Sequence, residues 1–175
     1  MTVRRVAVIG AECVGKTELA QQLARHLPGL WIPEYLREFC DRLQRTPRPE
    51  EQAAIIAQQR RLEAEAIAAA RAQGLAWVLA DSAPLTSAVY SELLFDDRSL
   101  YEVAAAHHAV YDATLLLEPD LPWVADGIQR DGPEARAASH RLLRARLAGF
   151  GLRYATVAGS GVSRFDAAVA ALRDL

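Results

Sequence analysis

The residues with the clearest chemical potential lie together near the start of the chain, over Gly10–Thr17. They read Gly-Ala-Glu-Cys-Val-Gly-Lys-Thr, which fits G-x-x-x-x-G-K-[ST], the pattern of a loop that wraps around nucleotide phosphates. Glycines let such a loop curl with its backbone N–H groups facing inward, and a following helix adds partial positive charge at its N-terminus. The pattern assigns Lys16 to the β- and γ-phosphates and the Thr17 hydroxyl to Mg²⁺. The residues expected to hold ATP and Mg²⁺ are Gly10, Glu12, Cys13, Val14, Gly15, Lys16 and Thr17.

The sequence on either side of this loop fits the same chemistry. Val3–Ile9 is an apolar, β-branched run that predicts a strand, and Thr17–Leu27 has apolar residues at helical spacing. Strand, glycine loop and helix form the arrangement that phosphate binding needs. A glycine-rich turn with an incidental lysine is the alternative. The chain has no N-K-x-D guanine-reading motif, which favours ATP as the nucleotide.

Two carboxylates follow predicted strands and are candidates for the reaction itself. Asp81 closes an apolar run, where an acid commonly supports Mg²⁺ in phosphate-loop proteins, although Asp81 could instead cap the next helix. Glu34 ends the second predicted strand, where it could accept the proton of an acceptor hydroxyl. A surface or N-cap glutamate is the alternative for Glu34, and Asp81 is the alternative base.

Arginines near these carboxylates suggest a second group of site residues. Arg37 lies three positions after Glu34, so it could pair with Glu34 or hold substrate phosphate or hydroxyls. Arg130 and Arg136 flank Asp131-Gly132-Pro133, and an arginine-bearing loop that closes over the phosphates would shield the reaction from water. Solvated surface charge is the alternative for both. A lid-like segment is therefore expected at about residues 122–137.

Aromatic residues also lie at predicted strand ends and loops. Trp31, Tyr35 and Trp123 offer flat rings on which a nucleoside base could stack, and core packing is the alternative for each. His107 and His108 lie in an alanine-rich helix without partners at metal-ligand spacing. We interpret these two histidines as structural.

Strands and helices alternate along the whole chain, as the site requires. Short apolar runs predict five buried strands, and helical periodicity fills the intervals between them. Buried strands separated by helices indicate an α/β, doubly wound parallel sheet of the nucleoside or nucleotide kinase kind, with ligands at the carboxyl ends of the strands. The predicted strands are Val3–Ile9, Leu30–Ile32, Leu75–Ala80, Ala113–Leu117 and Arg153–Ala158. The predicted helices are Thr17–Leu27, Tyr35–Leu43, Glu50–Gln73, Leu85–Phe95, Tyr101–Val110, Glu134–Ala148 and Ser163–Leu175.

Composition narrows the class of protein. The 175 residues are 51% hydrophobic and 24% charged with a net charge of −2, which fits one globular domain over residues 1–175. No basic field argues for a nucleic-acid partner, and no apolar run approaches the ~20 residues of a membrane span. The first strand begins almost at Met1, so we expect no signal peptide. Two cysteines without metal spacing, Cys13 and Cys40, fit the reducing cytoplasm. The sequence indicates no oligomeric state.

Two longer motifs add a resemblance that covers nearly the whole chain. E-Y-x-R-E-[YF] occurs at Glu34–Phe39, and Y-D-x-x-x-x-L-x-P-D-x-P-W-V-x-D-G occurs at Tyr111–Gly127. Together with the phosphate loop and Asp81-Ser82, they resemble the ribosylnicotinamide kinase domain of the bacterial NAD-biosynthesis regulator and its stand-alone ATPase relatives. The resemblance implies transfer of the ATP γ-phosphate to the 5′-hydroxyl of nicotinamide riboside, by a kinase domain alone. It places Arg130 and Arg136 in the lid. The acceptor site that it implies consists of Glu34, Tyr35, Arg37, Asp81, Trp123 and Asp126.

Three departures from the family pattern concern the acceptor. The family often reads D-T-D after the third strand, whereas this chain ends that motif with Ala83. The helix over Glu50–Gln73 lacks an aromatic residue, and Arg130 lies one step later than in D-G-x-R. Another nucleoside kinase and a nucleotide-dependent regulatory ATPase or switch therefore stay open as alternatives. A nucleoside-monophosphate kinase is weaker, because only Arg37 and Arg42 lie near the expected acceptor phosphate.

Overall fold

The computed structural model describes residues 2–124 and 132–173, and it has the alternating strands and helices that the sequence predicts. Boundaries agree with the expected ones to within a few residues at most ends. The strands are β1 (Arg4–Ile9), β2 (Gly29–Ile32), β3 (Trp77–Asp81), β4 (Ala113–Leu117) and β5 (Ala155–Val157). The helices are α1 (Lys16–His26), α2 (Tyr35–Leu43), α3 (Gln52–Gln73), α4 (Pro84–Phe95), α5 (Tyr101–His108), α6 (Pro133–Gly149) and α7 (Gly161–Ala171).

The five strands form one parallel sheet in the order β2-β3-β1-β4-β5. The first strand therefore lies at the centre, with β3 on one side and β4 on the other. After β1 the chain builds one half of the sheet and then crosses to the other half, which creates a topological switch point at the carboxyl end of β1. Ligands bind at such a point in open α/β sheets, and the Gly10–Thr17 loop begins there. The expected fold class is confirmed.

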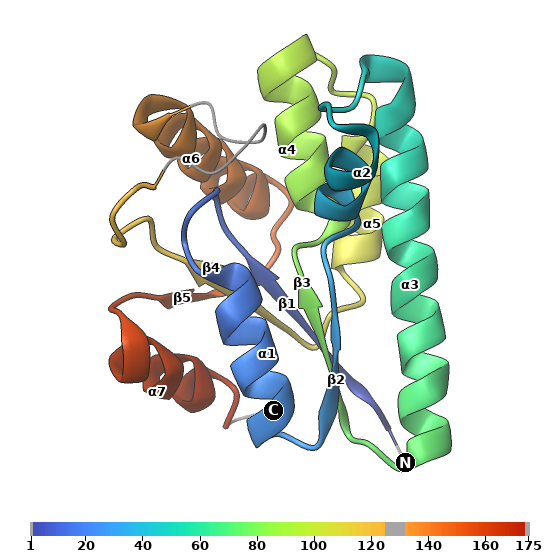
Figure 1. Ribbon diagram of the computed structural model, residues 1–175, viewed down its shortest axis with the longest axis vertical. Helices are drawn as coiled ribbons and strands as arrows, with labels where there is room; N and C mark the ends of the chain where they lie inside the picture. Colours follow the sequence, from blue (N-terminus) through green and yellow to red (C-terminus); the bar gives the residue numbers. More distant parts are fainter. Residues whose placement is uncertain (1, 125–131, 174–175) are drawn as a thin grey trace.

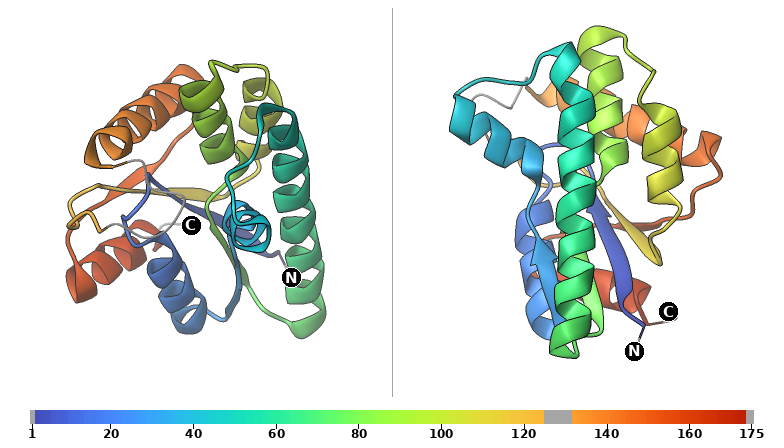
Figure 2. Two further views of the ribbon diagram at one scale, coloured as in Figure 1. Left: turned by 45° about the horizontal axis from the view of Figure 1, so that its top comes forward. Right: turned by 90° about the vertical axis from the view of Figure 1, so that its right-hand side faces the viewer.

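Residues alternate between the two faces of β1, and each face has its own helices. Val6 and Val8 pack into a core with α1 and α7, whereas Ala7 and Ile9 pack toward α4, α5 and α6. Figures 1 and 2 show these two helical layers with the sheet between them. A further core under α3 includes Ile32 of β2. Packing on both faces of β1 fixes the position of its carboxyl end, from which the Gly10–Thr17 loop begins.

Three helices differ at one or both ends from the sequence expectation. The predicted helix from Glu50 begins instead with a 3₁₀ turn, Pro49–Glu51, where the fixed φ of Pro49 suits a first helical position. The fifth helix ends at His108 rather than Val110. The N–H groups of Val110 and Tyr111 bond to carbonyl oxygens three residues earlier, as in a turn, and not four residues earlier. The last helix begins at Gly161 and ends at Ala171. None of these shifts moves a predicted site residue to another element.

The two histidines of α5 belong to a network of side-chain hydrogen bonds between α3, α5 and β4. His107 Nε2 lies 2.7 Å from Glu63 Oε2, and the Tyr111 hydroxyl donates to Glu63 Oε1 at 2.8 Å. His108 Nε2 is paired with Thr114 Oγ1 at 2.9 Å, and burial lowers the pKa of His108 to about 4. These contacts join α3, α5 and β4, which supports the structural interpretation. Over the residues that the structure describes, no helix combines the length and the apolar character needed to cross a bilayer.

Candidate functional site

The loop between β1 and α1 has the backbone that a phosphate cradle requires. Gly10 has φ 154°, and a Cβ there would lie 2.9 Å from Val14 Cγ2 and 3.1 Å from the Leu117 carbonyl oxygen. Gly15 has φ 78° and precedes the first turn of α1 without any side-chain cap. The first N–H groups of α1 therefore stay available to an anion at the positive end of the helix. Cys13 also adopts a positive φ, 54°, so the tight curl includes a non-glycine residue.

Lys16 lies across this loop. Its Nζ donates a 2.9 Å hydrogen bond to the carbonyl oxygen of Ala11, five residues earlier. Lys16 as a whole is only partly buried. Lys16 is the only lysine in the sequence, which makes it the single ammonium side chain that can serve the phosphates.

Thr17 and Asp81 meet at the base of the loop, as the sequence predicts for a Mg²⁺ pair. The Thr17 hydroxyl donates a 2.5 Å hydrogen bond to Asp81 Oδ2, and Asp81 is only 2% exposed. Asp81 Oδ1 has no hydrogen-bond partner among the described residues. Burial first, and then the charge of Glu34, raises the pKa of Asp81 above its usual range. Asp81 does not cap α4 with its side chain, since that helix begins after Ala83 without a side-chain cap.

An orphaned carboxylate oxygen beside a hydroxyl is the donor set that suits Mg²⁺. This ion prefers oxygen ligands and is typically bound by one or two protein groups together with substrate phosphates. The described residues contain no cluster of three or more His, Cys, Asp or Glu side chains that could form a complete protein cage. The Thr17 and Asp81 oxygens therefore fit a cation whose remaining ligands come from a nucleotide.

Glu34 and Tyr90 face this centre from α2 and α4. Glu34 occupies the N-cap position of α2, but its side chain makes no capping hydrogen bond. Its carboxylate is therefore not engaged by the N-terminus of the helix. Its charge acts on Asp81, and burial followed by the charges of Glu12 and Glu34 raises the pKa of Tyr90. The Tyr90 hydroxyl lies 3.4 Å from Glu12 Oε2 in the phosphate loop. No sequence pattern singles out Tyr90, because it lies in the middle of α4 and belongs to no motif.

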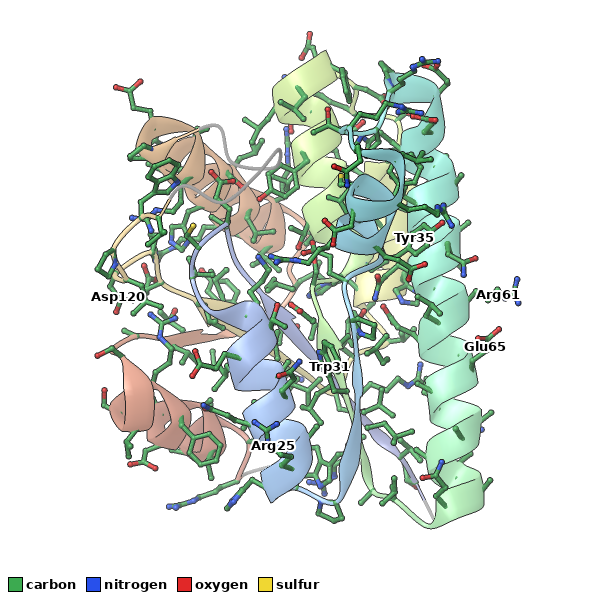
Figure 3. All side chains as sticks on the ribbon, viewed as in Figure 1. Arg25, Trp31, Tyr35, Arg61, Glu65 and Asp120 are labelled. Carbon is green, nitrogen blue, oxygen red and sulfur yellow. The ribbon has the colours of Figure 1, made fainter. Side chains whose placement is uncertain are left out.

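The remaining acceptor candidates on α2 divide into a fixed residue and an exposed one. Tyr35 packs beside Phe39 and Ile55, its backbone N–H donates to Gln59 Oε1 at 2.9 Å, and its hydroxyl accepts from Arg42 at 3.2 Å. Figure 3 shows Tyr35 between α2 and α3. Arg37 is exposed, and within the described chain it makes no ion pair with Glu34, although its charge lowers the pKa of Asp81.

The two tryptophans lie on different parts of the molecule. Trp31 of β2 packs against the core cluster that also contains α1, and Figure 3 shows it between β2 and α1. Its partly buried ring therefore packs against the core, and its expected role in stacking on a nucleoside base stays a prediction. Trp123 lies half-buried on the loop after β4. The indole Nε1 atoms of both lack a hydrogen-bond partner among the described residues. Among the described residues, neither indole ring forms a ring pair with Tyr35.

The loop after β4 is attached to the phosphate loop and to α6. Cys13 Sγ donates to the Val124 carbonyl oxygen at 3.1 Å, and Arg136 Nη1 donates to the Leu121 carbonyl oxygen at 2.9 Å. Arg136, in the first turn of α6, thereby steadies the loop that carries Trp123. Asp126 and Arg130, which were expected in the acceptor site and the lid, lie outside the described residues.

A buried arginine far along the chain also reaches the phosphate loop. Arg164 of α7 is 4% exposed and donates through Nη1 to the Val14 carbonyl oxygen at 2.8 Å. It is also paired with the Asp120 carboxylate. The only local signal is one arginine in an alanine-rich helix, and nothing in the sequence connects it to a loop 150 positions earlier.

Comparison with known proteins places this geometry in context. Residues 5–164 match a family described as AAA domain. Among curated proteins, none matches the sequence. The matched region spans the phosphate loop, both candidate carboxylates and Arg164.

Solved structures with a similar fold include several kinases. The NadR protein in complex with NR has a TM-score of 0.82 and 24% identity, over 98% of this chain and 51% of that chain. Deoxyadenosine kinase from M. mycoides, with products bound, has a TM-score of 0.62 and 12% identity, over 98% and 100%. Thymidylate kinase from Ehrlichia chaffeensis has a TM-score of 0.64 and 16% identity, over 92% and 89%. The chain thus has a phosphate-loop α/β fold and spans about half the length of the NadR protein.

Proposed function

We propose that this chain, which belongs to the AAA domain family, transfers the γ-phosphoryl group of ATP to a hydroxyl of a small nucleoside-like acceptor. The observation that carries the proposal is the Thr17–Asp81 pair beneath the phosphate loop, with the Glu34 carboxylate acting on it from α2. A site for transfer needs one group that binds phosphates and another that handles the incoming hydroxyl.

The phosphate side of the mechanism follows from the loop. The amides of Gly15 and Lys16, at the start of α1, would bind phosphate oxygens. Lys16 Nζ would exchange the Ala11 carbonyl oxygen for the β- and γ-phosphate oxygens, where negative charge grows during transfer. Thr17 and Asp81 would hold Mg²⁺, which when bound neutralises charge on those oxygens. Gly15, Lys16 and Thr17 lie in the loop after β1 and at the start of α1, and Asp81 is the last residue of β3.

The acceptor side favours Glu34 over Asp81 as the base. Asp81 is buried and already accepts the Thr17 hydroxyl, so it is committed to the phosphate side of the site. Glu34 is partly exposed, stands at the free N-terminus of α2 and makes no capping bond. Its carboxylate can therefore orient an acceptor hydroxyl and receive its proton. Arg37, one turn along the same helix, would hold acceptor hydroxyls.

Nicotinamide riboside is the leading acceptor. The motifs at Glu34–Phe39 and Tyr111–Gly127 support it, as does the fold likeness to the NadR protein in complex with NR. Incubation of the protein with ATP, Mg²⁺ and nicotinamide riboside should yield nicotinamide mononucleotide, detected by mass spectrometry. Turnover no higher than that of Lys16→Ala would remove this acceptor. A parallel panel of nucleosides and nucleoside monophosphates would then identify another acceptor or exclude the kinase activity.

A nucleotide-dependent regulatory switch is the second candidate. The observation that favours it is Ala83, a buried methyl group where the resembling family often has an additional carboxylate. Such a switch would hydrolyse ATP slowly in the absence of any acceptor, at a rate that no nucleoside stimulates. Stimulation of ADP release by one nucleoside, with stoichiometric formation of its phosphate ester, would decide for the kinase.

A further inference from the structure

The Val14–Gly15 peptide of the phosphate loop is held from behind by a side chain from the other end of the chain. Arg164 Nη1 donates to the Val14 carbonyl oxygen at 2.8 Å. In a trans peptide the C=O and the following N–H point in opposite directions. A Val14 carbonyl that points at Arg164 therefore turns the Gly15 N–H away from Arg164, toward the open side of the loop, where phosphate binds.

The guanidinium of Arg164 also bonds to three other residues, which are Gly159, Glu118 and Asp120. Nε donates to the Gly159 carbonyl oxygen at 2.7 Å, Nη2 donates to the Glu118 carbonyl oxygen at 3.3 Å, and Nη2 is paired with Asp120. Asp120 Oδ2 in turn accepts the Gly159 N–H at 2.6 Å. Arg164 and Asp120 thus join the phosphate loop, the end of β4 and the turn between β5 and α7. Figure 3 shows Asp120 on the loop after β4, on the α7 side of the molecule and remote from Tyr35.

Stability alone is a poor reason for this arrangement. Removing a guanidinium from water is costly, and an apolar residue of similar size often serves a core as well as a buried ion pair does. Ala168, one turn later on α7, is fully buried in the core without any polar partner. Besides its pairing with Asp120, Arg164 donates to three backbone carbonyl oxygens, and the one on Val14 belongs to the phosphate loop. A planar guanidinium with several donors can hold them at once, whereas an ammonium group cannot.

We propose that Arg164, oriented by Asp120, is a positioning residue that sets the phosphate loop in its anion-binding conformation. This inference rests on the proposed function, because it assumes that the loop binds a nucleotide. Arg164 itself touches no phosphate. It acts through the Val14–Gly15 peptide, so its loss should weaken binding of the phosphates rather than binding of the acceptor.

The test compares Arg164→Lys with Arg61→Lys, the same change at an exposed arginine on α3. Calorimetric titration uses Mg·ATP and, as a probe of the loop alone, inorganic tripolyphosphate. For Arg164→Lys we expect at least a tenfold rise in Kd for both ligands. We also expect a raised KM for ATP with the acceptor KM within twofold, while far-UV circular dichroism stays native. Arg61→Lys should match the wild type.

A second variant guards against a folding defect. Asp120→Asn keeps one acceptor oxygen but replaces the other oxygen, and the negative charge, with an NH₂ donor, so one of the two bonds to Arg164 and the Gly159 N–H is lost. It should raise both Kd values about threefold, while Asp166→Asn on the exposed face of α7 should not. Wild-type affinity in folded Arg164→Lys, or in Asp120→Asn should the former not fold, would overturn the inference and leave the proposed function intact. Failure of the wild type to bind either ligand would overturn both.

Discussion

Thr17 and Asp81 join the first turn of α1 to the last residue of β3 through a 2.5 Å hydrogen bond. The two residues are 64 positions apart, yet parallel pairing of β1 with β3 brings their strand ends together. Asp81 Oδ1 is buried and has no hydrogen-bond partner within the described structure. A buried carboxylate with a free oxygen is costly to the fold, and it is retained at the place where a cation would be needed.

This cost predicts that Asp81→Asn stabilises the apo protein at pH 8. Because the folded-state pKa of Asp81 is raised, the native state binds its proton more tightly than the unfolded state. Stability therefore falls as pH rises through the window between the unfolded and folded pKa values. The amide removes this loss, so Tm should rise at pH 8 and the difference should shrink toward pH 4.

The measurement is thermal unfolding without metal or nucleotide across this pH range. Phosphoryl transfer by the same variant should fall by at least a hundredfold, since the neutral amide is a poor partner for Mg²⁺. If Asp81→Asn had a lower Tm than the wild type at pH 8, the prediction would be wrong, because favourable contacts would then outweigh the cost of burying the Asp81 charge.

Lys16 gives a labelling prediction that needs no mutation. Since it is the only lysine, an amine-directed reagent can modify only Lys16 and the N-terminal amine. We expect Mg·ATP to slow modification of Lys16 at least tenfold, because the ammonium would then be held by phosphate oxygens, while the N-terminal amine reacts at an unchanged rate. Peptide mass spectrometry reads both sites in one sample. Equal rates with and without nucleotide would contradict the assignment.

Glu34→Gln separates chemistry from nucleotide binding. Since the proposed role of Glu34 is to handle the acceptor hydroxyl and not the phosphates, kcat should fall at least tenfold while the Kd for ATP changes less than twofold. Glu102→Gln, an exposed change on α5, serves as the matched control and should leave both constants unchanged. Steady-state kinetics and calorimetry measure the two effects. An unchanged kcat would transfer the role of the base to Asp81.

Gly10→Ala tests the geometry of the loop. The added Cβ would press on Val14 and on the Leu117 carbonyl oxygen in a backbone region that favours glycine, costing about 1–3 kcal/mol of stability and most of the nucleotide affinity. Gly149→Ala at the end of α6 meets no atom within 4 Å and should be neutral or stabilise by up to about 1 kcal/mol. Chemical denaturation of both variants makes the comparison. Similar losses in the two would exclude a special role for the Gly10 backbone.

Local patterns in the sequence predict most of the fold and the phosphate side of the site. Apolar runs mark every strand of the sheet, and Gly10–Thr17 carries its chemistry within eight adjacent positions. Asp81 is equally accessible to prediction, because an acid directly after a buried run must lie at the carboxyl edge of a parallel sheet. In each case, residues that are adjacent in the sequence both form the motif and determine the local structure.

Contacts between distant elements explain what the sequence does not reveal. Arg164 reaches Val14 only because α7 packs beside α1, and the Tyr90 hydroxyl reaches Glu12 only because α4 covers the other face of the sheet. Trp31 illustrates a different limit, since alternation along β2 directs its partly buried ring against the core cluster that includes residues of α1. A shift of one residue in the register of β2 would turn the Trp31 ring to the other face of the sheet, and the residue types at a strand end do not specify this register.

Calorimetry of Mg·ATP binding, with wild-type protein and Lys16→Ala side by side, tests the nucleotide assignment most directly. The wild type should give saturable heat with one nucleotide per chain, and the variant should lose at least a hundredfold in affinity while keeping its Tm. An absence of heat from the wild type at millimolar ATP, or equal affinities in the two proteins, would contradict the account.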